Sequence, residues 1–227
     1  MKHNLKKYFK NLLTKSLVAL LFSILLLSCS NNQKFKTVKI GDQVWMAENL
    51  NVDKFRNGDS IPHAKIDKEW EEAGKNGQPA WCYYENNPAN GKIYGKLYNW
   101  YAVTDSRGLA PEGWRIPVDE DWEKLIKQLG GDDVAGGKLK ATDTTYWRSP
   151  NTVAAKGTSF TALPGGERDP GGGFYYLGES SFWWSTTEIG TDNDNAWSLR
   201  LNYGASNVYR SSTNKKDLGF AVRCLRD

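Results

Sequence analysis

Few residues of this chain belong to the types that perform catalysis or bind metal ions. His63 is the only histidine after His3, and a zinc site needs several nitrogen or sulfur ligands. No serine lies in a Gly-x-Ser-x-Gly sequence, so a hydrolase triad is not indicated. Carboxylate pairs such as Asp119–Glu120 are typical of helix starts and turns. We therefore expect no catalytic residues and interpret His63 as an exposed loop residue.

One oxygen-rich segment has the ligand types that calcium prefers. Residues 191–196 read TDNDNA, in which Asp192 and Asp194 supply two carboxylates. The spacing, the central glycine and the final glutamate of an EF-hand loop are absent. A polar hairpin turn is the favoured interpretation, and a calcium site at Asp192 and Asp194 is the alternative. No other cofactor is expected.

The N-terminal segment has the features of an export signal. Residues 1–28 contain five lysines and no acidic residue, and their apolar run over residues 17–27 is too short to span a bilayer. The sequence LLSC at residues 26–29 resembles the lipobox of bacterial lipoproteins, which implies cleavage before Cys29 and lipidation of that cysteine. A membrane helix that is not cleaved is the alternative. Residues 29–36 then form a short polar tether.

The charge balance argues against a nucleic-acid partner. Of the 30 Lys and Arg residues in the chain, five lie in residues 1–28, which leaves 25 against 26 Asp and Glu. The part after the signal thus has a net charge of about −1, and no strong positive field remains to attract a phosphate backbone. Because two cysteines in an exported protein suggest a bridge, a disulfide between Cys82 and Cys224 is predicted, with two buried thiols as the alternative.

The pattern of apolar residues predicts one α+β domain over residues 37–227, with few helices, many short antiparallel strands and long glycine-rich loops. Residues 37–50 read as a hairpin that turns at Gly41–Asp42, and residues 67–74 as a short helix capped by Asp67. Residues 118–131 form the clearest amphipathic helix. Short strands are expected in AWCYYE, GFYYLG, SFWWSTTE, NAWSLRLN, NVYRSS and LGFAVRCL.

Adjacent aromatic residues raise the question of what covers each face of the sheet. In SFWWSTTE, Phe182 and Trp184 share one face while Trp183 points to the other, and Tyr175 and Tyr176 must also diverge. Either the sheet is covered on both sides, which is favoured, or one aromatic set is exposed and suits a sugar or a protein partner. The candidate contact residues lie on the glycine loop (residues 163–174) and on nearby strands: Trp183, Tyr175, Arg168, Asp169 and Tyr209.

Several ordered segments resemble the Fibrobacter succinogenes major paralogous domain: VWMAENLNV, YGKLYNWYAV, GWRIPVDEDWEKL, AGGKLKAT, the glycine loop and GFAVRCLRD. The resemblance covers residues 37–227. It implies a fold similar to the formylglycine-generating-enzyme and C-type-lectin-like group, and an exported, lipid-anchored protein of Bacteroidetes-like bacteria. Val118 departs from the threonine that is usual there, so Asp119 is expected to become the helix N-cap.

These features lead to three hypotheses. The first is a non-catalytic, lipid-anchored recognition module of the cell envelope that binds a glycan or an envelope protein. The second is a structural envelope protein without a ligand, and the third is an enzyme distantly similar to the formylglycine-generating group. We expect attachment to the outer membrane through Cys29. The absence of acidic residues directly after Cys29 favours the periplasmic leaflet.

Overall fold

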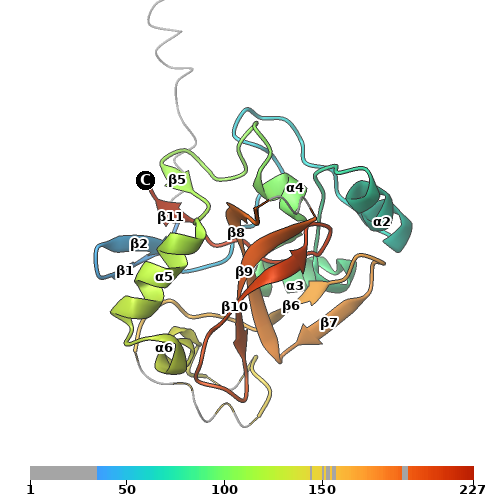
Figure 1. Ribbon diagram of the computed structural model, residues 1–227. Helices are drawn as coiled ribbons and strands as arrows, with labels where there is room; N and C mark the ends of the chain where they lie inside the picture. Colours follow the sequence, from blue (N-terminus) through green and yellow to red (C-terminus); the bar gives the residue numbers. More distant parts are fainter. Residues whose placement is uncertain (1–34, 144, 150, 152–153, 155–156, 191–193) are drawn as a thin grey trace, which may run out of the picture. The chain divides into compact units, whose positions relative to one another are not determined.

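The computed structural model describes residues 35–143, 145–149, 151, 154, 157–190 and 194–227 (Figure 1). Residues 35–227 form one compact unit. The predicted signal, Cys29 and most of the tether lie outside the described residues. In the ranges described, none of the helices has the length and apolar character needed to cross a bilayer.

The N-terminal hairpin forms as predicted and is part of a small sheet. β1 (Thr37–Ile40) pairs antiparallel with β2 (Gln43–Met46) around the Gly41–Asp42 turn. The sheet order is β1-β2-β11-β5, in which β5 is Trp114–Arg115 and β11 is Leu225–Arg226. The last residues of the chain therefore lie between segments that come much earlier in the sequence.

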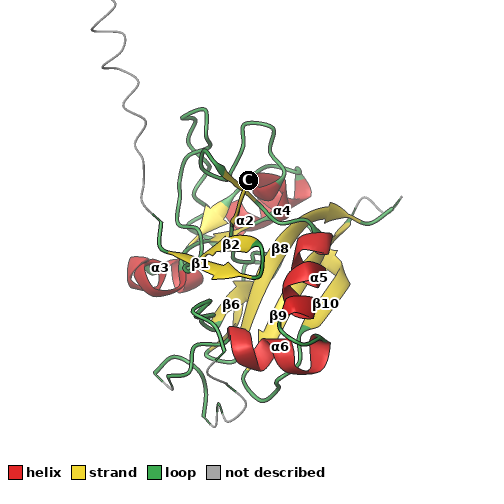
Figure 2. Ribbon diagram, turned by 90° about the vertical axis from the view of Figure 1, so that its left-hand side faces the viewer, coloured by secondary structure: helices red, strands yellow, loops and turns green. Residues whose placement is uncertain are grey.

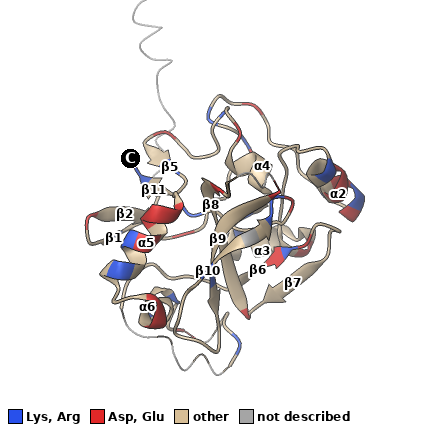
Figure 3. Ribbon diagram, viewed as in Figure 1, with Lys and Arg blue, Asp and Glu red and all other residues tan. Residues whose placement is uncertain are grey.

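Both predicted helices are present, with small shifts at their ends. α2 (Asp67–Lys75) begins after Ile66, so Asp67 is its first helical residue rather than its cap. α5 (Asp119–Gln128) likewise begins after Val118, and the Asp121 carboxylate accepts the Val118 N–H at 3.0 Å. The proposed cap at Asp119 is therefore wrong. Acidic residues fill the first turn of α5 and Lys127 lies in its last turn (Figure 3), as the helix dipole favours.

The remaining short elements were not predicted as such. They are the 3-10 turn η1 (Tyr84–Asn86), α3 (Pro88–Tyr94), α4 (Trp100–Val103), α6 (Asp132–Leu139) and β4 (Leu97–Tyr98). β4 pairs with β3 (Trp81–Cys82), which lies within the strand predicted in AWCYYE. α3 and α4 are capped by Asn87 and Asn99, whose side chains accept a backbone N–H of the first turn. The architecture is thus α+β, as expected, with strand-rich curled sheets and few helices.

A five-stranded sheet forms the centre of the unit. Its order is β10-β9-β8-β6-β7, from β6 (Gly165–Arg168), β7 (Phe174–Leu177), β8 (Ser180–Glu188), β9 (Asn195–Asn202) and β10 (Tyr209–Lys215). Its pairs are antiparallel except β6 with β8, which run parallel at Gly166 and Ser181. Figure 2 shows α5 and α6 alongside β8, β9 and β10.

The strand β8 is buried on both faces, which confirms the favoured interpretation of its aromatic run. Trp183 packs with Trp122 of α5 and with Phe160, at ring centroid distances of 6.2 and 6.0 Å. Phe182 and Trp184 point to the other side, where both contact Phe220. Adjacent side chains of one strand thus belong to two separate apolar clusters.

The predicted disulfide is not formed, and both cysteines are buried free thiols. Cys82 packs beside Trp70 and Leu97, whereas Cys224 belongs to the cluster that contains Met46 and Tyr98. Because the two side chains lie in different parts of the core, a bridge would require the backbone to move. Burial raises the pKa of each thiol to about 12.

We expect both thiols to be unreactive in the folded chain. A pKa that rises from 9.0 to about 12 lowers the thiolate fraction roughly 1,000-fold at neutral pH. In the full chain with Cys29→Ser, Ellman's reagent should modify neither thiol in the native state and two per chain in guanidinium without reductant. Finding no thiol after denaturation would mean that the disulfide forms after all.

Candidate functional site

Three tyrosines are the exposed large aromatic residues in the described part of the unit. Tyr175, Tyr176 and Tyr209 are 49%, 45% and 46% exposed. They lie on the five-stranded sheet together with Glu167 and Arg200, and we call these five residues the tyrosine face. Figure 3 shows β7, which carries Tyr175 and Tyr176, without any charged residue.

Strand register brings the members of the tyrosine face together. Arg200 is paired with Phe182 on one side and with Tyr209 on the other, so the three side chains share a face of the sheet. Because Trp183 packs on α5, this face is the one that α5 leaves uncovered. Glu167 is paired directly with Tyr175 across β6 and β7. The Tyr176 ring centroid lies 6.0 Å from that of Phe182. Phe182 therefore connects Tyr176 with Arg200 and Tyr209 on this face.

Arg200 is held in place between aromatic rings. Its guanidinium carbon lies 5.5 Å from the Tyr176 ring centroid and 5.2 Å from that of Phe182. Its Nε and Nη2 donate to Ser180 Oγ at 3.3 and 3.2 Å. No carboxylate forms a salt bridge with Arg200 among the residues that the structure describes. Its charge is therefore available to a ligand on this face.

Glu167 is an acid with an altered proton affinity. Burial raises the pKa of the Glu167 carboxyl to about 7, while the charge of Arg200 lowers it and that of Asp169 raises it. Near neutral pH the group therefore exists in both its protonated and its ionised form. A carboxyl group of this kind can accept and donate hydrogen bonds, which suits hydroxyl groups of a ligand.

Tyr176 has a backbone conformation that changes the direction of its side chain. Its φ is 64°, in the left-handed region that non-glycine residues rarely occupy. In a regular strand Tyr175 and Tyr176 would point to opposite faces, but here their ring centroids are only 6.2 Å apart. The prediction that the two tyrosines diverge is therefore wrong. The strained residue creates a double-tyrosine surface.

The structure separates the five predicted contact residues into two groups. Tyr175 and Tyr209 are exposed on the tyrosine face, and their role as contact residues stays a prediction. Trp183 is fully buried, and its Nε1 donates to Asn49 Oδ1 at 2.8 Å, so it is wrong as a contact residue.

Arg168 is also wrong as a contact residue, because it is fully buried. It connects the glycine loop to α2 by donating to the Gly172 carbonyl at 3.0 Å and to Asp67 Oδ1 at 3.0 Å. Asp169 is half-buried, and its carboxylate accepts the Gly173 N–H at 2.7 Å. It stabilises the loop turn and influences Glu167 only through its charge.

Sequence reasoning missed Tyr176, Arg200 and Glu167. The signal for Arg200 was present, because Leu199 and Leu201 flank it in a strand and must share the opposite, buried face. No comparable signal marks Tyr176, since the left-handed conformation of a tyrosine cannot be read from its sequence neighbours.

Two other predicted positions have different outcomes. His63 is half-buried rather than exposed, and its ring stacks on Trp81 at 3.8 Å. Of the calcium candidates, Asp192 lies outside the described residues, and the Asp194 carbonyl accepts the Lys216 N–H at 2.9 Å. Within the described residues, no group of three or more His, Cys, Asp or Glu side chains could hold a metal ion.

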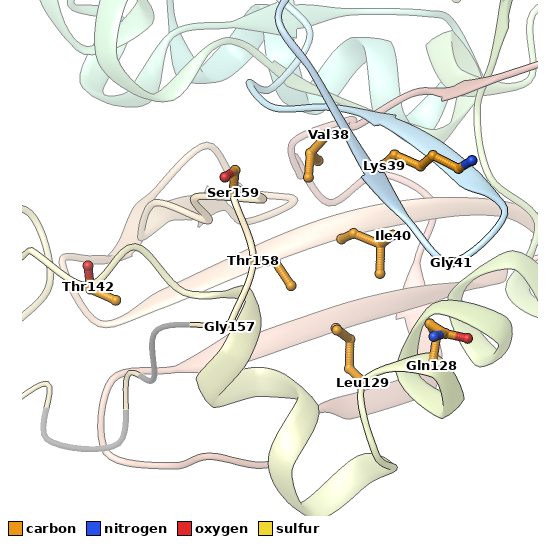
Figure 4. A pocket seen from close by; sticks show the side chains of 10 residues that line it. All are labelled: Val38, Lys39, Ile40, Gly41, Gln128, Leu129, Thr142, Gly157, Thr158 and Ser159. Carbon is orange, nitrogen blue, oxygen red and sulfur yellow. The ribbon is translucent and has the colours of Figure 1, made fainter.

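An open cavity of about 700 Å³ lies between β1, the end of α5 and residues 157–159 (Figure 4). Its lining includes Val38, Ile40, Leu129 and Thr158, and among the described lining residues only Lys39 is titratable. This lining offers little chemistry for specific recognition. The tyrosine face is therefore the better candidate site.

We expect the ionisation of the Glu167 carboxyl to lower the free energy of unfolding as the pH rises. Between pH 4.5 and about 7 the folded chain binds more protons at this residue than the unfolded chain, so the free energy of unfolding falls with pH. After allowance for its partial exposure, Glu167→Gln should stabilise the protein by about 1–2 kcal/mol at pH 8 and have little effect near pH 4. Urea unfolding across this range measures the difference. The exposed Glu112→Gln is the control, and equal pH profiles for both variants would contradict the assignment.

The comparison with known proteins assigns the chain to a family. The model of the Fibrobacter succinogenes major domain matches residues 38–226, which is nearly the whole unit described above. No curated protein and no solved structure matches the chain significantly. The chain therefore belongs to the Fibrobacter succinogenes major domain family.

Proposed function

We propose that this protein is a non-catalytic, lipid-anchored recognition module of the cell envelope that binds a glycan through its tyrosine face. The observation that carries the proposal is the contiguous set of exposed Tyr175, Tyr176 and Tyr209 around the positioned Arg200. The strand-rich α+β fold agrees with the lectin-like relationship that the sequence suggested.

A glycan fits this surface better than a large protein partner. Exposed tyrosine rings provide flat apolar surfaces for the C–H faces of sugars, and their phenol groups can bond to hydroxyls. Arg200 and Glu167 supply a cation and a carboxyl group beside the rings. The aromatic area is small and broken by polar groups, whereas stable protein interfaces bury a wider continuous area.

The environment of the cysteines favours recognition over catalysis. A formylglycine-generating type of reaction depends on a reactive thiolate. Cys82 and Cys224 are buried, and burial raises the pKa of both thiols to about 12. A thiol of this kind is a poor nucleophile at neutral pH.

The anchor in this proposal is a lipid on Cys29. The support is the basic segment, the short apolar run and the sequence LLSC that precede it. Two or more acyl chains hold a protein stably at a membrane, where each buried CH₂ contributes about 0.8 kcal/mol. Residues 30–36 span at most about 25 Å when extended, which would keep the recognition unit close to the outer membrane.

Removal of one tyrosine ring should weaken glycan binding. We expect the full chain to bind one or more members of a glycan array, and Tyr176→Ala to weaken the strongest interaction about 10-fold, because central aromatic contacts contribute most to affinity. The control is Ile66→Ala, which removes an exposed apolar side chain from the start of α2. Absence of glycan binding, or equal affinities in the two variants, would contradict the proposal. Capture of an envelope protein at the same tyrosines would replace the glycan as ligand.

Lipidation can be tested separately in bacteria grown with an alkyne fatty acid. We expect label on the wild-type chain, recovery in the membrane fraction and a mass that lacks residues 1–28. Cys29→Ser should lose the label and leave the membrane fraction, whereas Cys82→Ser should keep both properties. A labelled Cys29→Ser chain, or a wild-type chain with an intact Met1, would disprove the anchor.

A further inference from the structure

Arg223 is a buried cation that lacks a carboxylate partner within the described residues. It is 1% exposed, and its hydrogen bonds go to neutral oxygen atoms: Asn49 Oδ1, the Ala47 carbonyl and the Phe160 carbonyl. Burial lowers the pKa of its guanidinium to about 9. A buried charge that is solvated only by neutral groups attracts an anion wherever one has access.

One donor of this guanidinium remains free for such an anion. Arginine has five N–H groups. Nε makes one bond, Nη1 makes two and Nη2 makes one, to Asn49 Oδ1 at 2.8 Å. In the part of the chain that the structure describes, the second N–H of Nη2 has no acceptor.

Arg223 also lines a cavity of about 330 Å³, which is within the range of small-molecule sites. The cavity lies between residues 47–51, α3 and the segments that contribute Ala141, Tyr146 and Thr161. Among its other lining residues, Lys92 and Tyr146 have side chains without a described hydrogen-bond partner. They add a second cation and a phenol hydroxyl to the donor of Arg223.

The two carboxylates that line the cavity are engaged elsewhere. Glu48 forms an ion pair with Lys36 at 2.7 Å, and Asp143 accepts the Thr145 N–H at 3.2 Å. Neither forms an ion pair with Arg223, and Glu48 acts on it only through its charge, which raises the pKa of the guanidinium.

The cavity wall includes a strained residue. Thr161 has a φ of 50°, which is a rare conformation for a β-branched side chain. Its Oγ1 donates to the Ala47 carbonyl at 3.0 Å, and the preceding carbonyl, that of Phe160, accepts from Arg223. The strained residue thus lies directly beside the groups that bind the guanidinium, and such strain is concentrated at functional sites.

We propose that this cavity binds a small molecule through a carboxylate, which accepts the free N–H of Arg223 while Lys92 and Tyr146 contact its polar remainder. The carboxylate could belong to an acidic sugar or to an amino acid, since both have the required group and size. The site is separate from the tyrosine face and does not rest on the function proposed for that surface.

The test uses the full chain in detergent and measures binding by calorimetry. Glucuronate and alanine are the carboxylate probes, glucose and alaninamide are their uncharged or amidated counterparts, and inorganic phosphate is the third anion. We expect saturable binding of at least one carboxylate at concentrations up to about 10 mM and at least 10-fold weaker binding of its counterpart. The stronger of the two carboxylates identifies the ligand class.

Variants then locate the binding. Tyr146→Phe and Lys92→Gln should each weaken carboxylate binding about 3- to 10-fold, because each removes one polar contact at the cavity. Lys127→Gln changes an exposed lysine of α5, and Tyr176→Ala changes the tyrosine face; both should bind as the wild type does. Arg223→Lys should lose binding if circular dichroism shows that it folds.

Four results would overturn the proposal: no carboxylate binding, equal binding of the counterparts, binding of phosphate alone, or carboxylate binding that Tyr146→Phe and Lys92→Gln leave unchanged. Each of these results can be measured without the Arg223→Lys variant, so the proposal is still tested if that variant does not fold.

Discussion

The structure depends on the solvation of one buried guanidinium. Arg223 lies near the end of the chain and reaches the carbonyl groups of Ala47 and Phe160 and the amide oxygen of Asn49. The same Asn49 oxygen accepts the indole N–H of Trp183. Because a buried charge is costly unless all of its partners are in place, these four distant segments must assemble together. This requirement connects the N-terminal hairpin, the central sheet and the C-terminal strand in one cooperative unit.

The strand β8 explains how such a unit leaves aromatic side chains exposed on one face. Trp183 anchors one face of the sheet to α5, and Trp184 anchors the other to the cluster around Phe220. Towards β7 and β10 this second cluster ends, and the outward side chains of Tyr175, Tyr176 and Tyr209 remain exposed. The exposed rings are therefore supported by a sheet that is packed on both sides, which keeps them in fixed positions.

Sequence patterns predicted the elements that have strong local signals. The α5 periodicity and the hairpin turn are local properties, and the adjacent tryptophans in β8 indicated a two-sided core. The pairing of Cys82 and Cys224 depends on tertiary placement, so composition predicted a bridge that the structure lacks. Arg168 and Arg200 illustrate the same limit, because both are arginines of sheet strands. Only the packing of Trp70 and Asp67 on Arg168 makes it structural, while Arg200 remains on an open face.

The glycine loop shows how the close approach of two backbone segments builds the fold. At Gly172, with φ of 101°, an added Cβ would lie 2.5 Å from the Cβ of Asp67, so the loop needs a glycine to approach α2. Arg168 then fixes the same approach by binding the Gly172 carbonyl. The segments WMAENL, the glycine loop and GFAVRC thus supply contacts that build the unit. Side chains of β7 and β10 that point outward do not make these contacts, so substitutions at these positions can leave the fold intact.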